Sequence, residues 1–146
     1  ELLPDELDAV LGMNAVSGDN LSPHHMPSAH SILENEGMNP SYGACSNVMT
    51  DTHKNTFTYG MNNRTRRYDM ALYESLSYED RLVFDQYDLQ RVYAESRPNV
   101  DMDIVKSKLK EEYDMAMGMR EVKESLTLEG EQDMRNIEEM KEEGCR

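Results

Sequence analysis

The chain has 146 residues and a formal net charge of −14, with 15 Lys and Arg against 29 Asp and Glu. Two cysteines, Cys45 and Cys145, are too few for a disulfide framework or a four-thiolate zinc site. No apolar run reaches the roughly 20 residues of a spanning helix, and no basic-then-apolar leader opens the chain. We therefore expect no membrane span and no intact secretory precursor. Because the first residue is Glu1, we expect a piece of a larger polypeptide.

The first 65 residues are punctuated by Gly and Pro every few positions, which indicates short elements joined by loops. One helix is predicted from about Ser28 to Glu36. Pro27 precedes it, the Ser28 side chain is a good N-cap, and Gly37 is suited to end it in a left-handed conformation.

From about residue 66 the pattern is helical almost throughout. A short helix is expected over 68–75. A second helix begins after the capping sequence at Ser77 and stops before Pro98. A third opens at Asp101 or Asp103, and its apolar positions recur four residues apart at Val105, Leu109 and Tyr113.

These elements predict an α+β fold, mostly α, with a small N-terminal half and a helical C-terminal half. We expect a single domain over residues 1–120, with a histidine-bearing core at 13–67 and a helical part at 68–120. Residues 121–146 are charged and weakly amphipathic, and they are expected to form a solvated helix or a frayed tail.

The most informative segment contains two adjacent histidines, His24 and His25, between Pro23 and Pro27. At a strand end, neighbouring side chains point to opposite sides. One imidazole is then free to ligate a metal ion while the other faces a water molecule beside the substrate. His53, from a following helix, would close the metal site and leave open positions for water and phosphate.

The sequence His24-His25-Met26, an Asn further along and then His53 resemble the HNH nuclease motif, which belongs to the endonuclease VII-like, ββα-metal group. More narrowly, residues 13–60 are similar to C-terminal domains of bacterial polymorphic toxins. In those domains a His-His-Met-Pro-Ser stretch precedes a later His and a Thr-x-Tyr-Gly ending. Here that ending reads Thr56-Phe57-Thr58-Tyr59-Gly60. The resemblance covers about a third of the chain.

The resemblance implies a role for each matching residue. His24 and His53 would hold a divalent metal ion. The candidates for this ion are Mg, Mn, Zn and Ni. His25 would activate water as the general base, and we expect its ring to point toward solvent. Asn47, expected in a loop, would orient that base, and His53 would belong to the catalytic group as well as to the metal site. The resemblance also implies a ββα-metal-like arrangement for the N-terminal half.

Other residues have two interpretations each. Arg64, Arg66 and Arg67 form the densest basic cluster of an acidic chain, and we expect them to contact the phosphates of a nucleic acid, although a solvated cluster is the alternative. Asn47 is alternatively a plain turn residue, and Tyr59 alternatively ends a strand and is buried. His30 is expected to be structural, and Cys45 a small buried residue.

The resulting hypothesis is a toxin domain of a bacterial effector, secreted or delivered as part of a larger polypeptide and active in the target-cell cytoplasm. It would hydrolyse phosphodiester bonds of DNA or RNA with a metal ion and would be neutralised by a cognate immunity protein. One alternative is a toxin of the same lineage acting on RNA, a nucleotide or another phosphoester. The other alternative is a non-catalytic acidic domain that binds a protein partner.

Overall fold

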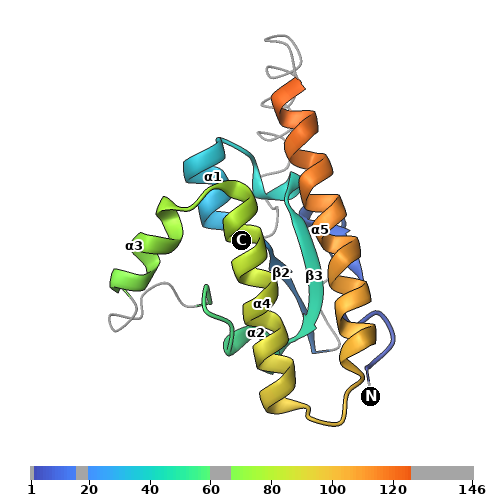
Figure 1. Ribbon diagram of the computed structural model, residues 1–146. Coiled ribbons are helices and arrows are strands. Elements are labelled where there is room, and N and C mark those ends of the chain that lie inside the picture. Colours follow the sequence, from blue (N-terminus) through green and yellow to red (C-terminus); the bar gives the residue numbers. More distant parts are fainter. Residues whose placement is uncertain (1, 16–19, 60–66, 126–146) are drawn as a thin grey trace.

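The computed structural model describes residues 2–15, 20–59 and 67–125, and it has the predicted α+β architecture (Figure 1). A small sheet in the N-terminal half is followed by a helical C-terminal half, so the predicted fold class is confirmed. In chain order the elements are β1 (Ala9–Leu11), η1 (Gly12–Asn14), β2 (Leu21–His25), α1 (Ala29–Glu36), η2 (Pro40–Tyr42), β3 (Ala44–Met49), α2 (Thr50–Lys54), α3 (Arg67–Ser75), α4 (Tyr78–Ser96) and α5 (Met102–Ser125). Within the described part of the chain, no helix has the length and apolar character needed to cross a membrane.

The three strands form an antiparallel sheet in the order β1-β3-β2, with β3 in the centre. The register sets Pro23 opposite Asn47 and His24 opposite Ser46. The backbone N–H and C=O of Asn47 both pair on the β1 side, with the Asp8 carbonyl at 3.1 Å and the Leu7 amide at 2.5 Å. Pro23 therefore occupies a pair without β2–β3 hydrogen bonds, and its missing N–H faces the outer edge of the sheet.

One face of the sheet is covered by the two long helices. Ala44, Ser46 and Val48 of β3 alternate with their neighbours and lie on the same face as Ser22 and His24 of β2. Ala44 and Val48 belong to the main core together with residues of α4 and α5, and Figure 1 shows these helices lying across β2 and β3. The buried members of this core are Leu7, Met26, Ala44, Val48, Leu82, Leu89, Tyr93, Val100, Val105, Leu109 and Ala116.

The helix boundaries follow the capping residues identified in the sequence. Ser28 accepts a hydrogen bond from the Ser31 amide at 3.2 Å, and Gly37 ends α1 with φ 63°. Ser77 caps α4 in the same way, through the Asp80 amide at 3.1 Å. The helix α5 continues without a break to Ser125, so the domain boundary expected at residue 120 falls inside it. Most of the predicted tail, 126–146, lies outside the described residues.

Buried polar contacts fix α4 to the N-terminal half. Glu6, fully buried, accepts a hydrogen bond from the Tyr93 hydroxyl at 2.5 Å and pairs with Arg97. At the other end of α4, buried Arg81 pairs with Glu36 at the end of α1. A buried charge is retained only when it is paired and hydrogen-bonded. These contacts therefore join α4 to the segment before β1 and to the end of α1.

Truncation of a core residue on α5 should destabilise the fold much more than truncation of an exposed residue on the same helix. Leu109 is 1% exposed, whereas Ile104 is 48% exposed. Leu109→Ala is expected to lower the free energy of unfolding by about 2–5 kcal/mol, and Ile104→Ala by well under 1 kcal/mol. Urea unfolding of both variants measures the difference, and equal losses would contradict the packing described for α5.

Candidate active site around His24 and His53

His24 lies on the helix-covered face of the sheet, near the end of β2. Its ring is 2% exposed, and its cross-strand neighbour is Ser46, which is fully buried. In an antiparallel pair, opposite residues project to the same face, so the His24 ring and the Ser46 hydroxyl meet on that side. The β2–β3 register therefore places a histidine in a largely apolar core.

His53 comes to the same place from α2, the short helix that follows β3. The ring centroids of His24 and His53 are 5.1 Å apart, with an angle of 60° between the ring planes. Oγ of Ser22 lies 3.3 Å from Nδ1 of His53, so Ser22 fixes that ring from the same face of β2. The two histidines predicted to share a metal ion thus lie beside each other.

The electrostatic environment keeps both imidazoles neutral. Burial, reinforced by the nearby rings of His53 and His25, lowers the pKa of His24 to about 3. Burial and the His25 ring lower the pKa of His53 as well. A neutral imidazole carries a lone pair on one nitrogen, which is the form that binds a metal ion or accepts a proton.

Two polar atoms beside these rings have no hydrogen-bond partner among the described residues: Nε2 of His24 and Oγ of Ser46. Most buried polar atoms in proteins are hydrogen-bonded, and a cluster of exceptions marks a place where a ligand, an ion or a water molecule is expected. Because Nδ1 of His53 already contacts Ser22, a ligand shared with His24 would have to bind His53 through Nε2.

The separation of the two rings matches what a metal ion bound to both imidazoles would require. Two histidines sharing one tetrahedral ion at about 2.0–2.1 Å have ring centroids about 5 Å apart, close to the 5.1 Å between His24 and His53. Across the described ranges, however, no cluster of three or more His, Cys, Asp or Glu side chains is arranged to hold a metal ion. The pair therefore offers two ligands, and water or substrate oxygens would have to complete the coordination.

His25 lies on the opposite face of β2, as predicted, but the expectation that it points toward solvent is wrong. Its ring is 5% exposed, and Nε2–H donates to the Pro40 carbonyl at 2.8 Å. Gly12 and Gly43 make room for it, because a Cβ on them would lie 3.1 Å from Nε2 and 2.9 Å from Cδ2. As a general base, His25 could accept a proton only at Nδ1, because the proton on Nε2 is donated to the Pro40 carbonyl.

Asn47 lies in the middle of β3, and the expectation of a loop or turn position is wrong. Its backbone pairs with the residues that precede β1, and its side chain is 8% exposed on the same face as His25. Within the described chain, Oδ1 of Asn47 has no hydrogen-bond partner. The Ser46-Asn47 turn signal is local, and pairing with strands on both sides overrides it.

The remaining predicted residues have mixed outcomes. Arg64 and Arg66 lie outside the described residues, and Arg67 begins α3 with a side chain that is not described, so their contact with phosphate stays a prediction. His30 is exposed on α1, away from the buried pair. Cys45 is fully buried, which confirms the expectation for it.

Sequence reasoning did not identify three neighbours of the pair: Ser22, Ser46 and Tyr59. Ser22 precedes His24 by two positions, and in a strand this spacing puts both side chains on one face. The sequence alone could therefore have indicated Ser22 as a neighbour of His24. Ser46 depends on the β2–β3 register, which no local pattern specifies. Tyr59 follows a turn after α2 and is 43% exposed, so the alternative interpretation as a buried strand end is wrong.

Comparison of the chain with protein-family models, with curated proteins and with solved structures finds no match.

The low pKa of His24 predicts a pH dependence of stability. Between pH 6.5 and about 3 the unfolded chain binds a proton at His24 that the folded chain does not. Stability therefore falls as the pH falls through this interval. His24→Gln removes this contribution, so its stability should fall less steeply over the same interval. Urea unfolding of chelator-treated protein from pH 7 to 4 measures the slope.

The matched control for the pH experiment is His30→Gln, at an exposed position of α1. It should reproduce the wild-type slope. A His24→Gln slope identical to that of the wild type would contradict the buried neutral state of His24.

Proposed function

We propose that this chain is the toxin domain of a larger bacterial effector and that it hydrolyses phosphodiester bonds of nucleic acid at a divalent metal ion bound to His24 and His53. The observation that supports this proposal best is the proximity of the two rings, whose centroids are 5.1 Å apart. Within this pair, the buried Nε2 of His24 has no hydrogen-bond partner among the described residues. Structural histidines in a core normally satisfy both ring nitrogens.

The chain's own residues prepare the pair for binding. His24 is neutral because of its burial, so it presents a lone pair without first losing a proton. In this proposal Nδ1–H of His53 donates a hydrogen bond to Oγ of Ser22, which leaves the Nε2 lone pair available. When bound, a divalent ion would stabilise negative charge that develops on the phosphoryl oxygens and leaving group.

The open side of the candidate site lies at His53 rather than at His24. His53 is partly buried, and its neighbour Tyr59 is 43% exposed, with 4.9 Å between their ring centroids. A substrate would therefore approach over α2 and the turn that follows it. His24, at 2% exposure, would hold the ion from beneath.

We assign His25 a positioning role instead of the base role implied by the family resemblance. Its ring joins β2 to the Pro40 carbonyl of η2, between Gly12 and Gly43. This contact fixes the strand end from which His24 projects to the other side. A residue held in this way contributes to the geometry of the site without touching the substrate.

The partners follow from the charge and from the resemblance. A net charge of −14 favours rapid association with a basic immunity protein, and it opposes binding of nucleic acid. Phosphate contact by Arg64, Arg66 and Arg67 remains part of the proposal, because these residues would offset that repulsion locally.

A second candidate function is that of a non-catalytic protein-binding domain. The observation that favours it is the exposure of large apolar side chains on α3 and α4, with Leu72 52% exposed and Tyr87 68% exposed. Such a domain would have no use for a metal ion at the histidine pair. The two functions therefore differ in their response to metal.

The nuclease proposal predicts metal-dependent cleavage and metal-dependent stabilisation that fail together. Purified protein is incubated with plasmid DNA and total RNA, with Mg²⁺, Mn²⁺, Zn²⁺ or Ni²⁺ in turn and with a chelator. At least one polymer should be cut, and only with metal. The same ion at a hundredfold excess over its Kd should stabilise the fold by about 2.7 kcal/mol. His24→Ala and His53→Ala should lose both effects.

His30→Ala is the matched control for this experiment, since His30 is an exposed histidine outside the pair. It should cleave and respond to metal as the wild type does. Cleavage that persists in the chelator, or in both His24→Ala and His53→Ala, would contradict the proposal. A protein that neither cuts nor responds to any of the four ions would leave the protein-binding function.

The positioning role of His25 predicts that a residue with the same hydrogen-bond donor will replace it. His25→Gln retains an N–H for the Pro40 carbonyl, so we expect cleavage within about tenfold of wild type. His25→Ala leaves that carbonyl without its donor and opens a cavity, so it should lower the melting temperature as well as activity. A loss of about 10²–10⁴-fold in His25→Gln at unchanged melting temperature would instead restore the base role.

A further inference from the structure

Tyr59 is an exposed aromatic ring in direct contact with the candidate site. Its ring centroid lies 4.9 Å from that of His53, and the planes meet at 71° in an edge-to-face arrangement. Such an arrangement involves at most one of the two faces of the Tyr59 ring. With 43% of the residue exposed, Tyr59 lies at the solvent-accessible side of the histidine pair.

The turn that carries Tyr59 is tied to His53 by hydrogen bonds. The backbone amide and the hydroxyl of Thr56 both donate to the His53 carbonyl, at 3.1 and 2.7 Å. The Tyr59 amide in turn donates to the Thr56 carbonyl at 3.3 Å. The ring is therefore held at a fixed distance from His53 rather than placed on an independent loop.

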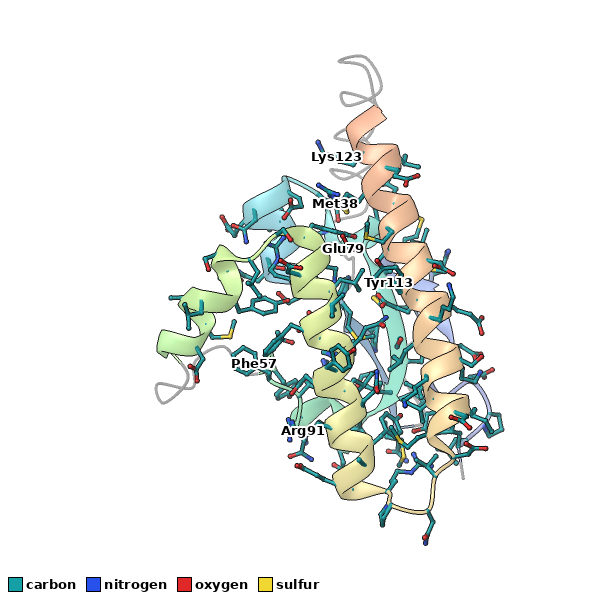
Figure 2. All side chains as sticks on the ribbon, in the orientation of Figure 1. Met38, Phe57, Glu79, Arg91, Tyr113 and Lys123 are labelled. Atoms are coloured by element: carbon teal, nitrogen blue, oxygen red, sulfur yellow. The ribbon has the colours of Figure 1, made fainter. Side chains whose placement is uncertain are left out.

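The same turn is also anchored to the helical half. The Phe57 amide donates to Asp88 of α4 at 2.7 Å. Figure 2 shows Phe57 between α3 and α4, where its ring centroid lies 6.0 Å from that of Tyr73 and 5.0 Å from that of Phe84. Because the turn is fixed at both Thr56 and Phe57, a ligand that stacks on Tyr59 would have little additional order to impose.

The charges that the described residues place around α2 and its following turn are nearly balanced. The exposed ends of α2 carry one acid and one base, Asp51 and Lys54. Arg91, which donates to the Asn55 carbonyl at the end of α2, also pairs with Asp88 and Glu95. Stacking between an aromatic ring and a base does not depend on net charge, so an acidic chain can gain nucleic-acid affinity from it in addition to any phosphate contacts.

We propose that Tyr59 is the stacking platform for an unpaired nucleobase beside the phosphate that the His24–His53 site receives, so that the preferred substrate is single-stranded nucleic acid. The inference rests on the proposed function and adds a substrate class to it. In a duplex each base is already stacked and paired, and it would have to leave the helix before reaching Tyr59. Single strands present their bases at no such cost.

The test is binding of a labelled 12-nucleotide single strand to the full chain in the presence of a chelator, followed by fluorescence anisotropy. Tyr59→Ala should weaken binding by about 5- to 150-fold, the effect of removing one base–aromatic stack. Tyr59→Phe keeps the ring and should bind within about twofold of wild type. The duplex, and a single strand with abasic sites throughout, should bind wild type more weakly than the intact strand does.

Tyr87→Ala is the matched control, because Tyr87 is a tyrosine of α4 that is 68% exposed. It should bind like wild type. A melting curve for each variant confirms that it is folded, and Tyr59→Leu, which keeps apolar bulk without an aromatic face, should reproduce the loss seen in Tyr59→Ala. Equal binding by Tyr59→Ala and wild type, or equal binding of abasic and intact strands, would overturn the inference.

Failure of this inference can be told apart from failure of the proposed function. Metal-dependent cleavage with an unchanged KM in Tyr59→Ala overturns the stacking role and leaves the hydrolase in place. Binding that depends on Tyr59, in a protein that cuts neither DNA nor RNA with any metal, supports the stacking site and removes the hydrolase.

Discussion

The pairing of β2 with β3 decides which side of the sheet each histidine meets. Because His24 lies opposite Ser46, its ring enters the space under the long helices, where His53 arrives from α2. His25 is thereby sent to the other face, against the Pro40 carbonyl. A shift of one residue in register would exchange the two rings and dismantle the pair, since side chains alternate with a period of two. The buried contacts of Glu6 and Arg81 with their partners hold the covering helix α4 over this arrangement.

The candidate site requires polar atoms in the same core whose apolar packing stabilises the fold. Neutral imidazoles, a hydroxyl that has no hydrogen-bond partner among the described residues, and apolar side chains share one layer between sheet and helices. Burial of unpaired polar atoms costs free energy that apolar packing must offset. The largest apolar contributions come from the long helices, as the core positions of α4 and α5 illustrate. The helical half thus supports a site to which it contributes no histidine.

Local signals were sufficient for α1, α3, α4 and α5 and insufficient for the environment of the site. Ser28, Gly37 and Ser77 set helix ends through contacts within a few residues, so their effect is visible in the sequence. The opposite orientation of His24 and His25 also follows from strand geometry alone. The burial of His25 depends on Gly12, Gly43 and Pro40, which are distant in sequence, and the strand position of Asn47 depends on pairing with two partners. Contacts of that range leave no pattern in a single sequence.

The position of Pro23 has a consequence for how copies of this chain behave toward one another. β2 is an outer strand, and outer strands offer rows of unused backbone groups that recruit further strands. At Pro23 that row lacks its donor, because the missing N–H faces outward. An incoming strand would lose a hydrogen bond there and meet the pyrrolidine ring. Pro23 therefore opposes edge-to-edge aggregation through β2, and it does so without removing a hydrogen bond between β2 and β3.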